Sequence, residues 1–209
     1  MLCGVTENPV PTPAFDLIGR RYDESFLERD AQIAEAQWLI DQLPAGSRVL
    51  DLGCGSGLPT VKQFVEAGLD VVGVDESSVM LDLAREQAPG AEYVLGDIRD
   101  LEPLGEFDAV ATFFALLMLK RDDIVTTLAG IRRLLRGPGL LAVSMVQGDF
   151  DALPVNFLGS PTTVTAYPPH ELRRVVAEAG FEVTALREYE AQAEPGRIEV
   201  QLYLRARAV

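Results

Sequence analysis

The amino-acid sequence predicts an α/β protein, and three observations lead to this fold class. The first is the stretch Arg48-Val-Leu-Asp-Leu-Gly-Cys-Gly-Ser-Gly-Leu58, where a short apolar run turns through three glycines and continues into a helical pattern. The second is that apolar strand-like runs alternate with helical patterns along most of the chain. The third is a final pair of strand-like runs joined by Glu194-Pro-Gly-Arg197, which predicts a C-terminal antiparallel hairpin.

Length and composition limit the classes of protein to consider. The chain has 209 residues and is 48% hydrophobic, which suits one domain with a sizeable core. Its net charge of -14 argues against nucleic acid and against anionic membrane surfaces as partners, because both require a basic surface. We therefore expect a small-molecule ligand, no nucleic acid and no membrane.

Cysteine and histidine are scarce in this chain. The cysteines are Cys3 and Cys54, and the histidine is His170, so the sequence predicts neither a disulfide framework nor a metal site. The N-terminus lacks the charged and apolar regions of a signal peptide. The longest apolar run, Val110 to Leu119, is too short to span a bilayer. These observations predict a cytoplasmic protein.

The N-terminal part of the chain is expected to be separate from the ligand-binding domain. Residues 1 to about 14 are rich in proline and are expected to be loose. Phe15 to Leu43 has helical spacing of apolar residues and ends at Pro44-Ala-Gly46. We therefore expect residues 1–44 to form a tail and a helical segment, and residues 45–209 to form the ligand-binding domain.

The glycine-rich turn after the strand Arg48 to Asp51 predicts a cradle for a small ligand. The glycines would let the backbone approach a ligand closely, and the next helix is expected from Leu58 to Ala67. A dinucleotide fingerprint needs G-x-G-x-x-G, but Leu58 replaces its third glycine. The Asp51 carboxylate would repel a phosphate and attract an ammonium. The cradle therefore favours a ligand such as S-adenosylmethionine (SAM), which carries an amine and no phosphate.

The stretch Val49-Leu-Asp-Leu-Gly-Cys-Gly-Ser-Gly57 resembles the first motif of class I SAM-dependent methyltransferases. The order of strand-like and helical segments over about residues 45 to 207 is similar to that family as well. The resemblance implies a doubly wound, seven-stranded, mostly parallel sheet with a C-terminal antiparallel hairpin. It also implies SAM as the cofactor and S-adenosylhomocysteine as the product. It further implies that the helical segment within residues 1–44 is a cap that covers the cofactor and part of the substrate.

The second expected strand, Asp70 to Asp75, ends in an acid roughly 20 residues after the glycine turn, the spacing that brings a carboxylate to a ribose. We expect Asp75 to accept hydrogen bonds from the ribose hydroxyls, although it could also cap the helix expected from Ser77 to Ala88. The resemblance places Glu76 and Met80 around the adenine. An ordinary core role for Met80 remains open.

The third expected strand, Glu92 to Leu95, is followed by Gly96-Asp97-Ile98. The resemblance assigns this segment to the adenine, with Asp97 accepting from the exocyclic amine, while a turn-forming role for Asp97 is the alternative. Tyr22 stands where the family often presents an aromatic ring to the cofactor, or else it packs at the core edge. The expected cofactor-binding residues are Tyr22, Asp51, Gly53, Cys54, Gly55, Asp75, Glu76, Met80, Gly96, Asp97, Ile98 and Phe113.

The second half of the chain is expected to hold the acceptor. The fourth strand, Phe107 to Phe113, should point into the cradle, and Leu117 and Met118 would form an apolar floor where many family members carry histidine. A helix from Asp122 to Leu135, a turn at Gly137-Pro-Gly139 and a strand from Leu140 to Met145 are expected next. The irregular segment 147–168 is interpreted as a lid. A helix from Pro169 to Ala179 precedes the hairpin strands Phe181 to Tyr189 and Ile198 to Arg205.

These observations predict a SAM-dependent methyltransferase that moves a methyl group to an O, N or C atom of a small, partly apolar metabolite by in-line displacement. His170 is the candidate general base, and a solvent-facing position in the first turn of its helix is the alternative. Cys54 is expected to pack rather than to react. A repurposed SAM enzyme (cyclisation or decarboxylation) and a non-catalytic SAM-binding protein remain alternatives. The acceptor and the oligomeric state, monomer or homodimer, are left open.

Overall fold

The computed structural model describes residues 13–26, 29–101, 104–194 and 197–209. The predicted loose N-terminal tail, apart from its last two residues, therefore lies outside the described residues, as do Cys3 and the centre of the predicted final turn. In chain order the elements are α1 (Ala14–Ile18), α2 (Arg21–Ser25), α3 (Asp30–Gln42), β1 (Arg48–Leu52), α4 (Thr60–Glu66), β2 (Asp70–Asp75), α5 (Ser78–Gln87), β3 (Glu92–Leu95), β4 (Phe107–Phe113), η2 (Leu116–Met118), α6 (Arg121–Leu134), β5 (Leu135–Val146), β6 (Phe150–Phe157), β7 (Ser160–Ala166), α7 (Pro169–Glu178), β8 (Phe181–Glu194) and β9 (Arg197–Ala208).

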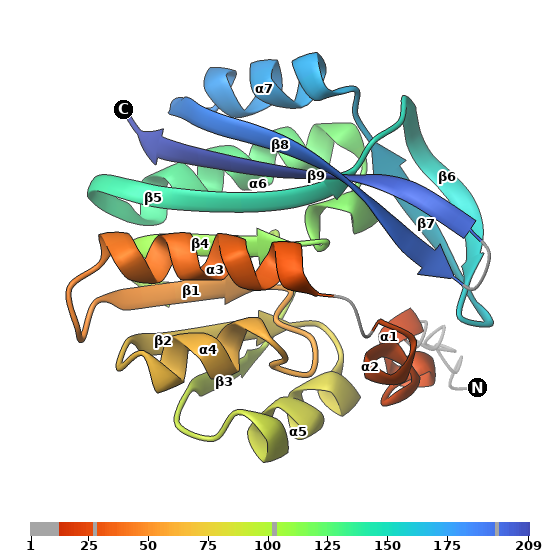
Figure 1. The fold of residues 1–209 in the computed structure, drawn as a ribbon, viewed down its shortest axis with the longest axis horizontal. Helices are drawn as coiled ribbons and strands as arrows, with labels where there is room; N and C mark the ends of the chain where they lie inside the picture. Colours follow the sequence, from red (N-terminus) through yellow and green to blue (C-terminus); the bar gives the residue numbers. More distant parts are fainter. Residues whose placement is uncertain (1–12, 27–28, 102–103, 195–196) are drawn as a thin grey trace, which may run out of the picture.

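The main sheet confirms the predicted fold class. Its seven strands are ordered β3-β2-β1-β4-β5-β9-β8 (Figure 1). Strands β1 to β5 pair in parallel, whereas β9 is antiparallel to both β5 and β8. The strand order reverses between β1 and β4. In doubly wound folds the crevice at such a reversal, outside the carboxyl ends of the strands, is where ligands bind.

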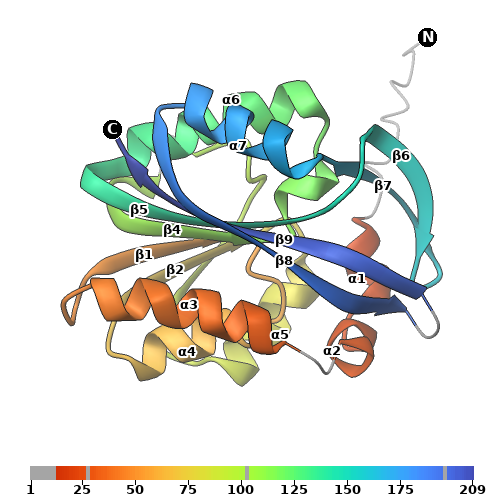
Figure 2. The same cartoon turned by 45° about the horizontal axis from the view of Figure 1, so that its top comes forward.

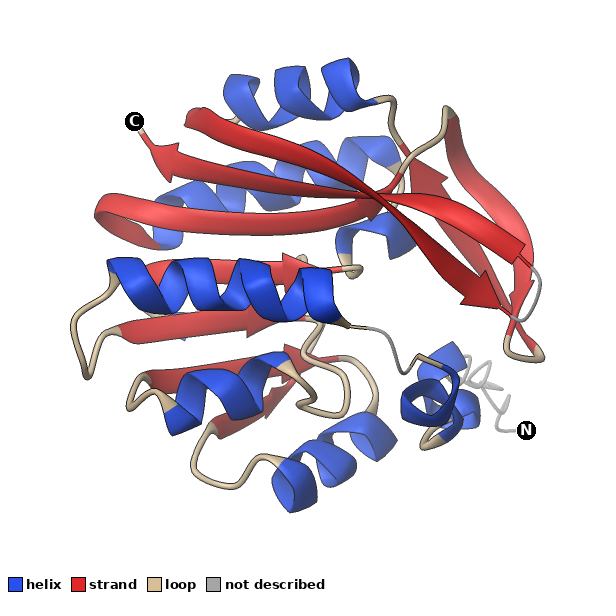
Figure 3. Cartoon of the chain, viewed as in Figure 1, coloured by secondary structure: helices blue, strands red, loops and turns tan. Residues whose placement is uncertain are grey.

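Helices cover both faces of this sheet, because successive residues of each strand point to opposite sides. Val49 packs in a buried cluster with Leu39 of α3 and Phe64 of α4. Its neighbour Leu50 belongs to the cluster on the other face, with residues of α6 and α7 such as Leu128. Figures 1 and 3 show the resulting layers, with the strands between the two groups of helices. Among the described residues, no helix is long and apolar enough to cross a membrane.

The segment 147–168 is more regular than the sequence predicted. It forms β6 and β7, which pair as a separate two-stranded antiparallel sheet. Leu158 and Gly159 join the strands with φ angles of 49° and 82°. The turn is hard to recognise because Leu158 adopts a positive φ, which is uncommon for a residue with a side chain. The predicted turn at Gly137-Pro-Gly139 lies instead within β5, where a register shift interrupts the pairing with β4.

The predicted helical cap consists of separate helices. Gly19, with φ of 49°, follows α1, and α2 is five residues long, before α3 packs along the sheet. Figures 1 and 2 show α1 and α2 beyond the carboxyl ends of β1 and β2, near the β6–β7 hairpin. Residues 13–26, which contain these two helices, are called the cap from here on. The loops at the strand-order reversal are therefore covered by two segments, α1–α2 from the first half of the chain and the β6–β7 hairpin from the second.

Candidate active site

A cavity lies at the carboxyl ends of β1 to β4, and we call it the cofactor cavity. It is lined by all but one of the residues that the sequence predicted to bind the cofactor, namely Tyr22, Asp51, Gly53, Cys54, Gly55, Asp75, Glu76, Met80, Asp97, Ile98 and Phe113. Gly96 is not part of the lining. Its amide instead donates to the carbonyl of Asp75 at 3.0 Å, so it connects the loops that follow β2 and β3.

The glycine turn after β1 has no room for larger residues. Gly53 has a φ of 72°, and a Cβ atom added there would lie 2.3 Å from the Cβ of Ala115. Gly55 also has a positive φ, of 53°. Both positions therefore require glycine, and the backbone amides of the turn stay close to the cavity. The amides of Gly53 and Cys54 both donate to the carbonyl of Val74, which joins this turn to β2.

Two buried acidic side chains, Asp51 and Asp75, line the cofactor cavity. Asp51 is 3% exposed, and burial together with the nearby Asp75 raises the pKa of its carboxyl group to about 8. Asp75 is 8% exposed, and burial also raises its pKa, although its hydrogen bonds to the amides of Ser77 and Gly55 oppose this. Those bonds measure 2.9 and 2.8 Å. A bound cation would relieve the unfavourable burial of the two acids.

The predicted helix-capping role near Asp75 belongs mainly to its neighbour. The Ser77 hydroxyl accepts from the amide of Met80 at 3.1 Å and caps α5. Asp75 holds the amide of Ser77 and thereby orients the cap. Asp75 thus serves both the helix start and the cavity, as the two open interpretations of the sequence allowed.

A third acid of the cavity, Asp97, is paired with an arginine that the sequence analysis did not single out. The Nε atom of Arg99 donates to both carboxylate oxygens at 2.9 and 3.0 Å. These hydrogen bonds lower the pKa of Asp97 below its usual value. Arg99 also lines the cavity, and its position two residues after Asp97 was the available signal.

The thiol of Cys54 is buried, which raises its pKa well above the usual range. A thiol in this state stays protonated and is a poor nucleophile.

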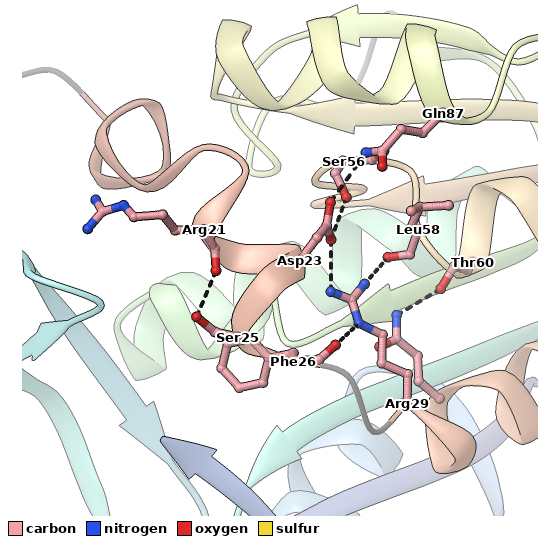
Figure 4. A network of polar contacts seen from close by, with 10 residues as sticks. Arg21, Asp23, Ser25, Phe26, Arg29, Ser56, Leu58, Thr60 and Gln87 are labelled. Atoms are coloured by element: carbon pink, nitrogen blue, oxygen red, sulfur yellow. Dashed lines mark hydrogen bonds and ion pairs between the residues drawn. The ribbon is translucent and has the colours of Figure 1, made fainter. Parts of the chain in front are cut away.

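The cap is fastened to the glycine turn by a network around Asp23 (Figure 4). The Asp23 Oδ1 atom accepts from the Ser56 hydroxyl at 2.9 Å and from Nη2 of Arg29 at 2.8 Å. Gln87 of α5 donates to the other Asp23 oxygen at 3.3 Å. Arg29 also donates to the carbonyls of Phe26 and Leu58. This network connects the cap, the glycine turn and α5.

A second carboxylate of the cap contacts the next loop. Asp16 of α1 accepts from the hydroxyl of Ser77, the residue that caps α5. The two loops that follow β1 and β2 are therefore each held by one acid of the cap, Asp23 and Asp16. Sequence analysis missed both acids, because their partners lie 33 and 61 positions away in the chain.

A second cavity, the acceptor cavity, lies between the cap, the β6–β7 hairpin and β9. Its wall is mostly apolar and aromatic, with one row of polar residues on β9. It includes Leu117 and Met118, which the sequence predicted as an apolar floor. The two cavities share a set of lining residues, which we call the junction: Phe15, Tyr22, Gln32, Phe114 and Met118.

Aromatic side chains of the hairpin and the cap pack against one another in the wall of the acceptor cavity. Phe157 of the hairpin packs on Phe26 with ring centroids 5.8 Å apart, and on Phe15 and Tyr22 of the cap at 6.3 and 6.5 Å. Arg21 strengthens the connection by donating to the carbonyl of Leu158 at 3.0 Å. The hairpin formed by segment 147–168 therefore contacts the cap beside this cavity, and its role as a lid over the acceptor stays a prediction.

Phe114 holds an unusual backbone conformation at the junction. Its φ is 56°, which carries a steric cost for a residue with a side chain. Its amide donates to the hydroxyl of Ser144 at 2.9 Å, and this contact holds the conformation. The result is that Phe113 and Phe114 both face ligand space, one toward the cofactor cavity and the other toward both cavities.

His170, the predicted candidate base, lies elsewhere. It is exposed in the first turn of α7 and is not among the residues that line either cavity. Among the described residues, no group of three or more histidine, cysteine, aspartate or glutamate side chains is arranged to hold a metal ion.

Comparison with known proteins agrees with this geometry. A family model described as a methyltransferase domain matches residues 49–139. The ubiquinone biosynthesis O-methyltransferase of Aromatoleum aromaticum is 30% identical over 160 residues, covering 68% of this chain and 67% of that protein. The CcbJ methyltransferase from Streptomyces caelestis has a similar fold, with a TM-score of 0.71, 23% identity, and coverage of 95% of this chain and 98% of that one.

The chain belongs to the class I SAM-dependent methyltransferase family, and SAM is the cofactor that this family uses. The magnesium-protoporphyrin O-methyltransferase of Rhodobacter capsulatus is 36% identical over 94 residues, which cover 41% of each protein. The chain spans less than half the length of several curated relatives that it matches, with 46%, 44% and 41% of their lengths covered.

Proposed function

We propose that this protein transfers the methyl group of SAM to an O, N or C atom of a small, partly apolar acceptor. One observation carries the proposal: the cofactor cavity and the apolar acceptor cavity meet at the junction. Methyl transfer requires the acceptor atom to lie in line behind the methyl carbon at about 3 to 3.5 Å, so two ligands must have adjoining sites. The names of relatives, such as the ubiquinone biosynthesis O-methyltransferase, support a small-molecule acceptor.

The donor set of the cofactor cavity fits SAM. Asp51 would pair with the ammonium group, because a buried carboxylate gains most from a neighbouring cation. Asp75 would accept from the ribose hydroxyls, and Asp97, Ile98, Glu76 and Met80 would surround the adenine. Gly53, Cys54 and Gly55 of the glycine turn line the same cavity and would lie beside the bound cofactor.

The protein's own contribution to the reaction is binding, orientation and exclusion of water. SAM supplies an electrophilic methyl group, so no nucleophile from the protein is needed. Four of the five junction residues, Phe15, Tyr22, Phe114 and Met118, present mostly apolar surface and would keep water away from the reacting atoms. Burial raises the pKa of Tyr22, so its phenol remains protonated at neutral pH and can donate a hydrogen bond there. The proposal assigns no catalytic role to His170, and the cytoplasmic location remains a prediction.

Calorimetric titration followed by a transfer assay tests the proposal. SAM and S-adenosylhomocysteine should each bind in the micromolar range, and label should then move from methyl-labelled SAM to members of a diverse acceptor library. Binding without transfer to any acceptor would favour a SAM-binding protein. No binding of either molecule to the folded protein would contradict the proposal.

A further inference from the structure

The acceptor cavity has one polar wall, and it lies on β9. Alternate residues of a strand point to the same side, so Arg197, Glu199, Gln201 and Tyr203 form one row, and all four line the cavity. The other polar lining residues, apart from Arg29, are uncharged: Tyr22, Gln32, Asn156 and Thr162. The rest of the wall is aromatic or aliphatic, including Phe26, Phe150 and Phe157.

The inner end of this row reaches the junction. The Tyr203 ring packs on Phe114 at 5.7 Å and on Phe113 at 6.3 Å, and Phe113 lines the cofactor cavity. Tyr203 is 2% exposed. Arg197 stands six positions further along β9, which is about 20 Å at the usual rise of a strand. The tyrosine hydroxyl is therefore the polar group of this row that is nearest to the reacting atoms, and the Arg197 charge is remote.

Hydrogen bonds give the row a fixed direction. The Tyr203 hydroxyl donates to Oε1 of Gln201 at 3.0 Å, and Nε2 of Gln201 donates to Oε1 of Glu199 at 3.1 Å. A carboxylate can only accept, so Glu199 requires the amide nitrogen of Gln201 to face it. The amide oxygen must then face Tyr203, and the single proton of the phenol is used there. What Tyr203 can offer a ligand is the remaining acceptor capacity of its oxygen.

The arginine near the junction is already neutralised. The Arg29 guanidinium lies 5.4 Å from the Tyr22 ring centroid, but it pairs with Asp23 at 2.8 Å. Its other two nitrogens donate to the carbonyls of Phe26 and Leu58. A carboxylate at the junction would thus find the lone pairs of Tyr203 and the neutral phenol of Tyr22, which can donate one hydrogen bond, but no uncompensated cation among the lining residues of the junction.

From this wall we propose that the acceptor is a flat aromatic molecule whose methylated atom is a hydroxyl oxygen or an amine nitrogen carrying a hydrogen, and that Tyr203 and Glu199 select it against carboxylates. This inference rests on the proposed methyl transfer. The aromatic ring lies among Phe26, Phe150 and Phe157, and the N–H or O–H donates to the Tyr203 oxygen. A nitrogen or oxygen lone pair forms the new bond to the methyl carbon, the carbon–sulfur pair stays with sulfur, and the displaced proton leaves to water.

Matched acceptors test this selection. Each set has one ring system and differs in a single group: 1-naphthol, 1-naphthylamine and 1-naphthoate, together with 5-hydroxyindole, 5-aminoindole and indole-5-carboxylate. With methyl-labelled SAM, the hydroxyl or amino members should be methylated at least tenfold faster than the carboxylates. Faster methylation of a carboxylate would overturn the inference, and so would transfer only to acceptors without an aromatic ring. Failure of SAM to bind would instead remove the proposed function itself.

Two substitutions separate selection from folding. Tyr203→Phe should lower kcat/KM for the hydroxyl and amino members about tenfold, as expected for one lost hydrogen bond, and leave the Kd of SAM within twofold. Glu199→Gln lets the Gln201 amide turn over, so that the Tyr203 hydroxyl can donate its proton to a ligand carboxylate. The ratio of the methylation rates of the hydroxyl or amino members to those of the carboxylates should then fall about tenfold. Tyr189→Phe is the matched control, since Tyr189 packs on the Tyr203 ring at 5.6 Å but lines neither cavity. An unchanged preference in both test variants would contradict the inference.

Discussion

The cofactor cavity and the acceptor cavity are built in different ways. The first is formed by the short loops at the carboxyl ends of adjacent parallel strands, and its polar groups are buried acids such as Asp51 and Asp75. The second is assembled from α1, α2, the β6–β7 hairpin and β9, and its wall is mostly aromatic and aliphatic. The parallel strands of the sheet thus support the binding of one ligand, while the N-terminal helices, the internal β6–β7 hairpin and the antiparallel strand β9 shape the site of the other.

The largest effect is expected from the cofactor side. Asp75→Ala should weaken SAM binding about a hundredfold or more, because two charge-assisted hydrogen bonds to the ribose contribute about 1.5 to 3 kcal/mol each. Calorimetry measures the change, and Asp70→Ala, at the exposed start of the same strand, is the control. An unchanged Kd would remove Asp75 from the cofactor site.

The pKa of Asp51 distinguishes the two cavities, since no buried aspartate or glutamate is found among the described residues that line the acceptor cavity. In the free protein the Asp51 carboxyl has a pKa of about 8 and carries a proton at pH 7. A bound ammonium favours the ionised form, so SAM binding should release close to one proton at pH 7. Affinity should then rise by up to about tenfold per pH unit as the pH increases toward 8. Calorimetry in buffers of different ionisation enthalpy measures the release, which Asp51→Asn should abolish. Absence of release by the unaltered protein would argue against an Asp51–ammonium pair.

A substitution in the acceptor cavity should change acceptor binding without changing SAM binding. Phe157→Ala removes the hairpin ring that packs on Phe26 and on the cap, so the acceptor KM should rise about tenfold. The Kd of SAM should change by less than about threefold, because Phe157 lines only the acceptor cavity. Steady-state kinetics and calorimetry together make the test. Equal losses in both constants would show that the two cavities do not act as separate sites.

Asp23 connects the cap, which lines the acceptor cavity, to the glycine turn of the cofactor cavity. Its substitution should therefore have a moderate effect on both SAM binding and acceptor binding. Asp23→Asn weakens the contacts to Ser56 and Arg29, and we expect about fivefold weaker SAM binding together with a raised acceptor KM. Hydrogen exchange of residues 13–26 should become faster. Glu24→Gln is the matched control, because Glu24 is exposed on the same helix. Equal behaviour of the two variants would mean that the Asp23 network does not hold the cap in place.

The smallest effect is expected at His170. His170→Ala should change kcat by less than about twofold, because the side chain is exposed on α7 and lines neither cavity. A pH–rate profile compared with that of the unaltered protein gives a second readout. A loss of roughly a hundredfold would support the general-base role that the lone histidine suggested.

The difference between the cavities also explains what could be predicted from the sequence. Asp51, the glycines and Asp75 lie within one strand–helix–strand unit, where spacing along the chain determines spacing in the fold, and they were predicted together. Tyr203, Phe157 and Asp23 come from segments that meet only through tertiary packing. The segment that holds Phe157 was predicted as a lid, but no local pattern showed which side chains of the three segments come together. The β6–β7 hairpin escaped prediction for a local reason, since its turn depends on the positive φ of Leu158.

The central claim is that the two cavities meet at the junction. A crystal structure with bound S-adenosylhomocysteine tests it most directly, because the sulfur marks where the methyl group departs. We predict that the ammonium lies against Asp51, the ribose against Asp75, and the sulfur in van der Waals contact with Tyr22, Phe114 or Met118. A sulfur atom that faces away from these residues, or a cofactor bound outside the cofactor cavity, would contradict the account.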